Sequence, residues 1–305
     1  MVHILVSRGW FPWETLNRRK SDGKQRFSSR ATEERYQTCL EEFQNYLQFQ
    51  NKSVHTIRAY LFPLRQFFEL YPTVNHENLL LYKCYLIDHY QPQTVNLRIR
   101  AMNCYVEFLH LPYSKLLMVK HRHRSFLENV ISQADYEYLK SCLLRDGRLT
   151  YYYAIRLMAA TGVRVSELVR FQVEDVRRGY VDLHSKSNRT RRIFIPKNIR
   201  TPCLEWLESM NRATGDVFLN RFGKQISPGG IRDQLKKFAC IYNLDPSVVY
   251  PHSFRHLFAK NFIERCSDIA MLSDILGHDN IETTRIYLHR SSSEQKQLFN
   301  TIVDW

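Results

Sequence analysis

Residues 274–287 read DILGHDNIETTRIY, which places His278 at the end of a Leu-Gly-His run and Tyr287 nine residues further on. Asp279 and Asn280 are both candidate N-caps for a helix that carries Tyr287, because their short side chains accept hydrogen bonds from free backbone N–H groups. A lone tyrosine is more often a packing residue than a reactive one. The meaning of this stretch therefore depends on the residues that precede it.

An arginine stands at a predicted helix start in residues 161–168, which read TGVRVSEL. Gly162 supplies a tight turn, and Arg164 follows where the new helix begins. Glu167 lies three residues later on the same helical face, so it is expected to hold the guanidinium of Arg164. Most arginines at helix starts are surface charges, so this pattern gains meaning only in combination with others.

A second arginine lies in residues 251–255, which read PHSFR. Pro251 suits the first turn of a helix, where a backbone N–H would have no helical partner in any case. His252 and Arg255 are three positions apart and therefore point in the same direction. Such a pair suits an anion, although most pairs of this kind are ordinary surface charges.

Between these two arginines the pattern changes to β-structure. Residues 179–184 and 191–195 alternate and are rich in β-forming side chains, and they flank the turn-forming run SKSN at 185–188. Together they predict a hairpin. A further short strand is predicted at residues 217–219, and the remainder of this half of the chain has helical periodicity.

Upstream, residues 33–109 contain four helical segments in which apolar side chains recur every three to four positions. Ser53 is the expected N-cap of the second segment, and Pro63 inside that segment predicts a kink or a break. The four segments are short enough to form one compact bundle. Their aromatic side chains are expected in its core and not as platforms for stacked bases.

The chain is therefore expected to have two domains. Residues 1–30 carry seven Arg and Lys against two acidic residues, which is typical of a flexible basic arm and equally of a solvated tail without a role. A KHRHR run at 120–124 predicts a basic linker. The expected divisions are a basic arm at 1–30, a helical domain at 31–118, a linker at 119–130 and a mixed domain at 131–305.

The charge balance predicts a polyanionic partner. The 305 residues contain 44 Lys plus Arg against 30 Asp plus Glu, a net charge of +14, and nucleic acid is the commonest partner of so basic a chain. The seven cysteines form no CxxC pair, which argues against a disulfide framework or a zinc site and fits a reducing cytoplasm. No apolar run approaches the ~18 residues of a membrane span, and no secretory signal is predicted.

Taken together, these patterns resemble the tyrosine recombinase (phage integrase) family, in which R, HxxR, LGH and TxxxY follow one another in this order. The resemblance covers residues 33–290. The family's catalytic positions fall on Arg164, Lys186, His252, Arg255, His278 and Tyr287. Serines flank Lys186 where the family often has glycines, so Lys197 and Arg189 stay open as alternatives for the catalytic lysine.

The resemblance implies roles that charge chemistry supports. Phosphodiester transfer concentrates negative charge on non-bridging oxygens, which planar guanidinium groups bind through paired hydrogen bonds. The implied donors to these oxygens are Arg164, Arg255 and His278. Tyr287 is the implied nucleophile, and because a free tyrosine has a pKa of about 10, His252 is the candidate base. Lys186 is the candidate acid for the leaving 5′ oxygen, and no ATP, metal or other cofactor is implied.

The resemblance also implies a fold and partners. The fold is mainly α with a small antiparallel β-sheet, built from an N-terminal helical core-binding bundle and a mixed catalytic domain. The partners are double-stranded DNA and, in a synaptic complex, a homo-tetramer; the apolar stripe of residues 295–305 either docks into a neighbouring protomer or packs on its own domain. The activity is site-specific recombination for integration and excision, inversion or dimer resolution. A type IB topoisomerase-like enzyme and a catalytically silent DNA-binding protein stay open as alternatives.

Overall fold

The computed structural model describes residues 30–111, 115–120, 129–184, 190–278, 280–288 and 300. Backbone contacts divide the chain into two compact units, Met1–His123 and Arg124–Trp305. Four sequence predictions fall outside the described residues: the basic arm, most of the linker, the hairpin turn with Lys186, and the C-terminal apolar stripe.

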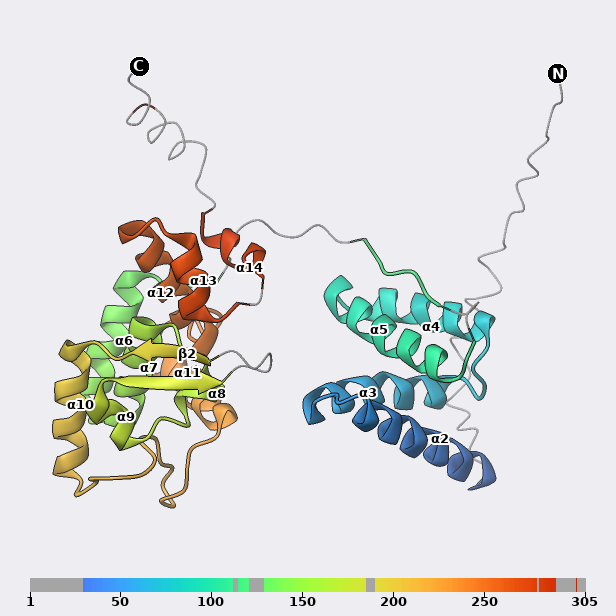
Figure 1. Cartoon of the computed structure of the whole chain (residues 1–305), viewed down its shortest axis with the longest axis horizontal. Helices are drawn as coiled ribbons and strands as arrows, with labels where there is room; N and C mark the ends of the chain where they lie inside the picture. Colours follow the sequence, from blue (N-terminus) through green and yellow to red (C-terminus); the bar gives the residue numbers. More distant parts are fainter. Residues whose placement is uncertain are drawn as a thin grey trace. The chain divides into compact units, whose positions relative to one another are not determined.

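The first unit is a helical bundle (Figure 1). Its helices are α2 (Arg30–Phe49), α3 (Val54–Leu70), α4 (His76–His89) and α5 (Pro92–Phe108). α3 packs against both α2 and α5, and α4 packs against α5. Aromatic rings fill the core, as the sequence predicts, and the rings with almost no exposure are Phe43, Phe67, Tyr82 and Tyr105.

α3 begins where the sequence predicts, but the break considered inside it is absent. Ser53 caps the helix as predicted, with its hydroxyl accepting the N–H of Thr56 at 3.2 Å. The break considered at Pro63 is wrong, because α3 continues through this residue. Pro63 is buried, and its carbonyl accepts a hydrogen bond from the hydroxyl of Tyr82 at 3.0 Å. Packing of this face against the bundle therefore outweighs the loss of one backbone donor.

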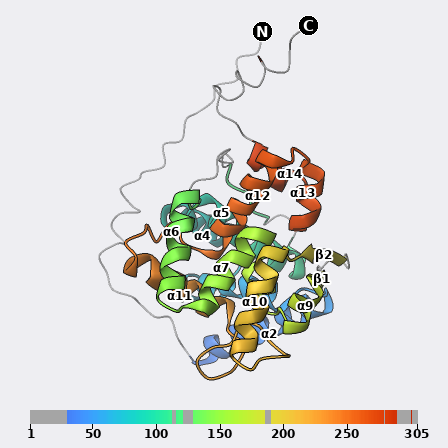
Figure 2. The same cartoon turned by 90° about the vertical axis from the view of Figure 1, so that its left-hand side faces the viewer.

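The second unit is mainly helical and contains one small sheet, which confirms the predicted fold class. Figure 2 shows α7 with α6 on one side and α10 on the other. α7 also packs extensively against α12. The elements are α6 (Gln133–Arg145), α7 (Leu149–Thr161), α8 (Val165–Leu168), α9 (Val173–Arg178), β1 (Tyr180–His184), β2 (Thr190–Phe194), α10 (Lys197–Ser209), α11 (Pro228–Ile241), α12 (Pro251–Arg265), α13 (Ile269–Leu276), α14 (Glu282–Arg285) and the 3₁₀ turn η3 (Ile286–Leu288).

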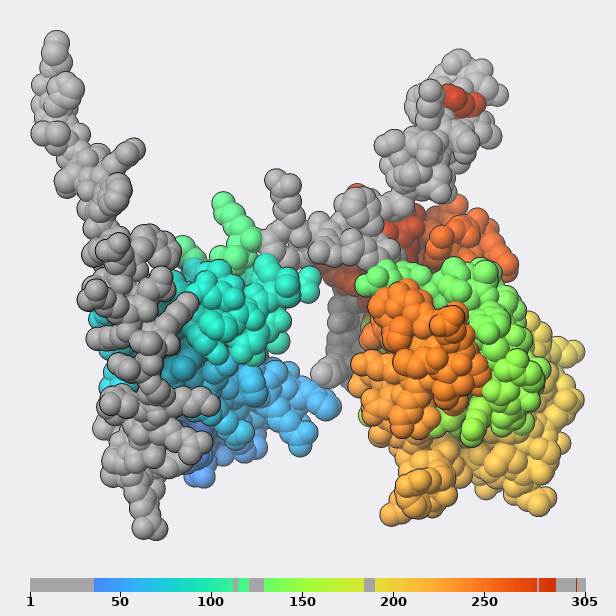
Figure 3. Space-filling model, turned by 180° about the vertical axis from the view of Figure 1, so that it is seen from behind, coloured from blue at the N-terminus to red at the C-terminus, as the bar shows by residue number. Residues whose placement is uncertain are grey.

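Contacts between segments far apart in the sequence close the core of this unit. On the face seen in Figure 3, the green surface of the α6 and α7 region adjoins the orange surface of the α11 region. The hydroxyl of Tyr242 donates to Asp146, 96 residues away, at 3.0 Å. The backbone N–H of Ile131 donates to the buried hydroxyl of Ser253 at 2.7 Å, which fixes the first turn of α12. No described helix is both long and apolar enough to cross a membrane.

The sheet is the predicted hairpin. β1 and β2 pair in antiparallel register, with Tyr180 opposite Phe194. The strand predicted at residues 217–219 is wrong, since this segment forms only an isolated bridge, between Leu219 and Gln225, and the sheet has two strands within the described residues. Val217 and Phe218 are fully buried. Their apolar pattern therefore reflects their place in the core and not strand pairing.

Candidate active site

Arg164 is placed by the turn between α7 and α8. α7 ends at Gly162, whose φ of +65° lies in the left-handed region. A Cβ at this position would overlap the ring of Phe258 and would lie 2.8 Å from the side chain of Leu276. Only glycine therefore lets the chain turn here while α12 and α13 approach so closely. Arg164 follows at the start of α8, as the sequence predicts.

Glu167 holds two guanidinium groups with one carboxylate. Its Oε1 accepts from Nη1 of Arg164 at 3.1 Å, and its Oε2 accepts from the Arg164 backbone N–H at 2.9 Å, which confirms the predicted pairing. Oε2 also accepts from Nη2 of Arg191, in β2, at 2.6 Å. The carboxylate thereby connects the start of α8 to the β-hairpin.

Arg255 lies at the centre of the site and is 3% exposed. Its Nη1 donates to the carbonyl of Gly162 at 2.6 Å, and its Nη2 donates to the carbonyl of Leu276 at 2.7 Å and to Nε2 of His278 at 3.0 Å. Burial lowers the pKa of Arg255 to about 9, and the neighbouring arginines add to this effect. The side chain is still a cation at neutral pH. Its hydrogen bonds to the two carbonyls offset part of the free-energy cost of burying this charge.

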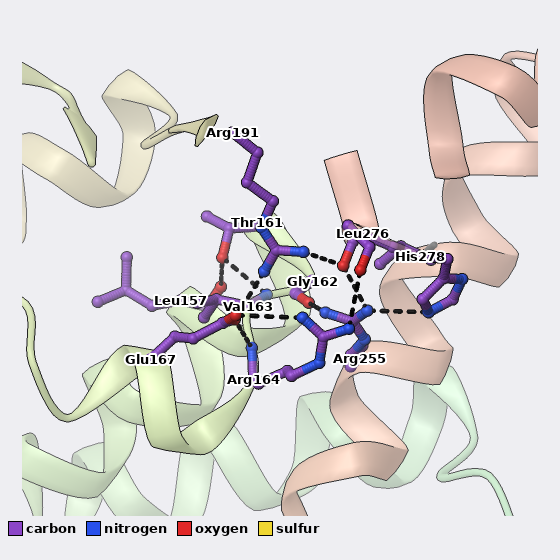
Figure 4. Close-up of polar contacts among 11 residues, drawn as sticks. Leu157, Thr161, Gly162, Val163, Arg164, Glu167, Arg191, Arg255, Leu276 and His278 are labelled. Carbon is purple, nitrogen blue, oxygen red and sulfur yellow. Dashed lines mark hydrogen bonds and ion pairs between the residues drawn. The ribbon is translucent and has the colours of Figure 1, made fainter. Parts of the chain in front are cut away.

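The turn at residues 276–278 gathers three guanidinium groups (Figure 4). The carbonyl of Leu276 accepts from Arg191 as well as from Arg255, and the carbonyl of Gly277 accepts from Nη2 of Arg164 at 3.0 Å. Three cations thus surround a single carboxylate, so positive charge is in excess. Such a concentration of partly buried cationic donors suits an anion.

His278 is held by partners on both ring nitrogens. Because a guanidinium can only donate, Nε2 accepts from Arg255, which leaves the ring proton on Nδ1 toward the hydroxyl of Thr284 at 2.8 Å. Burial lowers the pKa of His278 to about 4, with further lowering by Arg255, Arg164 and Arg191. The imidazole is therefore neutral at pH 7.

Tyr287 lies in η3, immediately after the short helix α14. Asn280 accepts the N–H of Glu282 at 2.9 Å near the start of α14, whereas Asp279 lies outside the described residues. The hydroxyl of Tyr287 lies 2.7 Å from Nδ1 of His256. Burial raises the pKa of Tyr287 to about 12, although nearby Arg255 acts in the opposite direction.

Of the remaining predicted residues, the structure describes only His252 and Lys197. His252 lies exposed in the first turn of α12, and its pKa is lowered by desolvation and by nearby Arg255. Lys186 and Arg189 lie outside the described residues, and Lys197 is exposed at the start of α10. Within the described ranges, no group of three His, Cys, Asp or Glu side chains could hold a metal ion.

Two residues of the cluster were not identified from the sequence. Arg191 shares a strand face with the buried Ile193, two positions on, so strand alternation pointed it inward. His256 follows Arg255 directly and lies four residues after His252, one turn along the same helix. In each case the residue spacing indicated on which face the side chain lies, but only the fold shows its hydrogen-bond partner.

Comparisons with known proteins identify the family to which the chain belongs. The phage integrase family model matches residues 129–294, a range that contains every candidate catalytic residue. The chain belongs to the phage integrase family. It is 30% identical over 288 residues to the tyrosine recombinase XerA of Pyrococcus horikoshii, covering 87% of this chain and 95% of that protein.

Two further similarities differ in extent. The tyrosine recombinase XerD of Staphylococcus saprophyticus is 32% identical over 154 residues, so the match spans 48% of this chain and 52% of that protein. Among solved structures, the XerH site-specific recombinase bound to its difH substrate superposes with a TM-score of 0.67 at 16% identity, covering 93% of this chain and 91% of that one. At this identity the superposition shows a shared fold.

Proposed function

We propose that this chain is a site-specific recombinase that cleaves and rejoins double-stranded DNA through a 3′-phosphotyrosyl intermediate on Tyr287. The chain is a tyrosine recombinase of the phage integrase family, and its relatives carry the name of that enzyme class. The observation that supports the site assignment is the position of Tyr287 near Arg255, one of the three guanidinium groups that donate to the turn at residues 276–278.

The proposed chemistry is a transfer between oxygen atoms. The oxygen of Tyr287 attacks the phosphorus, a new P–O bond forms, and the bond to the 5′ oxygen of the DNA breaks. Arg164 and Arg255 bind the non-bridging oxygens as their charge grows, which is where fixed donors lower a barrier most. The phosphotyrosyl bond is again a phosphodiester, so rejoining needs no external energy source.

The other candidate residues would complete the site. His278 is neutral and bonded to Arg255, so we assign it to hold that guanidinium toward the phosphate. To donate to a non-bridging oxygen itself, as the resemblance implies, its ring hydrogen would have to move from Nδ1 to Nε2. His252, exposed on the same helix as Arg255, would meet the DNA backbone nearby. Lys186 is the proposed acid for the leaving oxygen, with Lys197 and Arg189 as alternatives.

The proposed function includes assembly of several protomers on DNA. The similar XerH structure contains a recombinase bound to its DNA substrate, which supports DNA as the partner here. We infer four protomers on two duplexes in the synaptic complex, which light scattering of the protein–DNA complex would count. Recombination of inverted repeats near the coding region, detected by PCR, would identify integration and excision, inversion or dimer resolution.

Tyr287→Phe tests the proposal directly. The variant loses the nucleophilic oxygen, so covalent protein–DNA adducts should disappear from denaturing gels, while DNA binding should stay nearly unchanged because it depends on many phosphate contacts elsewhere. The substrate is a nicked duplex that carries an inverted repeat from the flanking DNA and traps the adduct after cleavage.

Tyr250→Phe is the matched control. Tyr250 precedes α12 and is near enough to Tyr287 to affect its pKa, but it has no proposed role in the chemistry. Its removal should leave adduct formation intact. Normal adduct formation by Tyr287→Phe would refute the assignment of the nucleophile.

A further inference from the structure

The hydroxyl of Tyr287 has a specific partner that the sequence did not suggest. Nδ1 of His256 lies 2.7 Å from the Tyr287 oxygen, and the two ring centroids are 5.7 Å apart. The ring of His252, the base expected from the sequence, lies 6.4 Å from the ring of His256. Of the two histidines, His256 is therefore the one that touches the oxygen that would react.

The protonation states suit a transfer from Tyr287 to His256. Burial lowers the pKa of His256 to about 4, with smaller contributions from His252 and Arg255. Burial raises the pKa of Tyr287 to about 12. At neutral pH the phenol therefore carries its hydrogen, and the neutral imidazole has a lone pair that can accept it at Nδ1.

We propose that His256 accepts the proton of Tyr287 during DNA cleavage. The inference rests on the proposed function. As the oxygen of Tyr287 bonds to phosphorus and the bond to the 5′ oxygen breaks, the hydroxyl proton moves to Nδ1 of His256. A separate acid protonates the leaving oxygen. In rejoining, the imidazolium of His256 returns the proton to the phenolate leaving group of Tyr287.

The surroundings of His256 link this step to the presence of the DNA phosphate. The titratable groups that face it are His252 and Arg255 on α12, Tyr287 on η3 and His278 after α13. None of them is an anion at neutral pH, and Arg255 is a cation, so an imidazolium is unfavourable. A phosphate bound by Arg255 brings a negative charge that offsets this repulsion. His256 thus becomes a better base when the substrate is in place.

Replacement of His256 separates proton acceptance from hydrogen bonding. His256→Asn retains an acceptor near Nδ1 but cannot take up a proton, and His256→Ala removes both functions. With the nicked duplex described above, both variants should form the covalent adduct on the order of 10²-fold more slowly or worse, with unchanged DNA affinity. Glu264→Gln, exposed near the end of the same helix, is the matched control and should cleave normally.

A more acidic nucleophile provides the decisive measurement. Incorporation of 3,5-difluorotyrosine at position 287 reduces the need for a base, so the defect of His256→Asn should shrink by at least tenfold relative to the tyrosine protein. A purely structural role for His256 would leave the defect unchanged by fluorination.

Three results would overturn the proposal: a normal cleavage rate in His256→Asn, faster cleavage in either variant, or a defect that fluorination does not reduce. If His256→Ala fails to fold, as judged by its melting temperature, His256→Asn alone decides. Failure of the unaltered protein to form any adduct would instead contradict the proposed function, so the two failures are distinguishable.

Discussion

Arg255 and Glu167 together hold the charge of the site in place. Arg255 reaches two backbone carbonyls and one imidazole, and Glu167 reaches Arg164 and Arg191. Loss of either partner from the Arg191–Glu167 pair would leave the other, partly buried charge without compensation. The fork geometry of the guanidinium matters as much as its charge, since one side chain must reach three acceptors.

Arg255→Lys should lower adduct formation on the order of 10²-fold, although the positive charge is retained. A lysine ammonium is compact and cannot reach the carbonyls of Gly162 and Leu276 and also present a fork to the phosphate. Single-turnover cleavage of the nicked duplex measures the effect, and a thermal melt shows whether the variant is folded.

Arg192→Lys is the control for this substitution. Arg192 is exposed on β2 and forms an ion pair with Asp182, so its replacement by lysine should change neither folding nor cleavage appreciably. A rate for Arg255→Lys close to that of Arg192→Lys would show that charge alone suffices at position 255.

At the scale of elements, the β-hairpin is fastened to the candidate site. Arg191 in β2 donates hydrogen bonds to two places: to the carboxylate of Glu167, within α8, and to the carbonyl of Leu276, at the end of α13. Residues 185–189, which include Lys186, connect β1 to β2. The connection therefore ends two residues before Arg191, whose side chain belongs to the guanidinium cluster.

Lys186→Ala should cleave ordinary DNA slowly and should be rescued by DNA with a 5′-bridging phosphorothiolate. A thiolate leaves without a proton, so the general acid is no longer needed. The ratio of cleavage rates on the two substrates measures the rescue. Lys197→Ala and Arg189→Ala are assayed in parallel, and the residue whose loss the modified DNA repairs is the acid. A Lys186→Ala variant that the phosphorothiolate does not improve would exclude Lys186 from this role.

At the scale of the whole molecule, excess charge governs the encounter with DNA. The chain carries 44 Lys plus Arg and a net charge of +14. A protein that neutralises phosphates releases counterions from DNA, and the released ions make binding weaker as salt rises. This contribution does not depend on the base sequence, so it supplies affinity and not selectivity.

The affinity for duplex DNA should therefore fall steeply with salt. A protein with about 6–10 phosphate contacts loses roughly 10³–10⁵-fold in affinity between about 50 and 200 mM salt. Fluorescence anisotropy over this range gives the slope of log affinity against log salt. A slope near zero would contradict an electrostatic contribution to binding, and Tyr287→Phe should share the slope of the unaltered protein.

The sequence determined the local structure around each candidate residue. Turn glycines, helix caps and the three-residue spacings depend on neighbours a few positions away, so Gly162, Arg164 and Glu167 could be placed from the pattern alone. Apolar periodicity predicted the helices and the hairpin for the same reason. Periodicity failed at residues 217–219, and the break expected from the proline failed at Pro63; in both places packing in the core outweighs local preference.

Only the tertiary structure decided which side chains meet. The bond between His256 and Tyr287 spans 31 residues, and the contacts of Arg191 and Arg164 with the turn at 276–278 span 85 and 113. No local rule couples residues so far apart, because their distance depends on how α7, α12, α13 and β2 pack. The sequence therefore identified Tyr287 as the nucleophile to test, whereas its partner His256 became visible when burial and helix packing brought the two rings together.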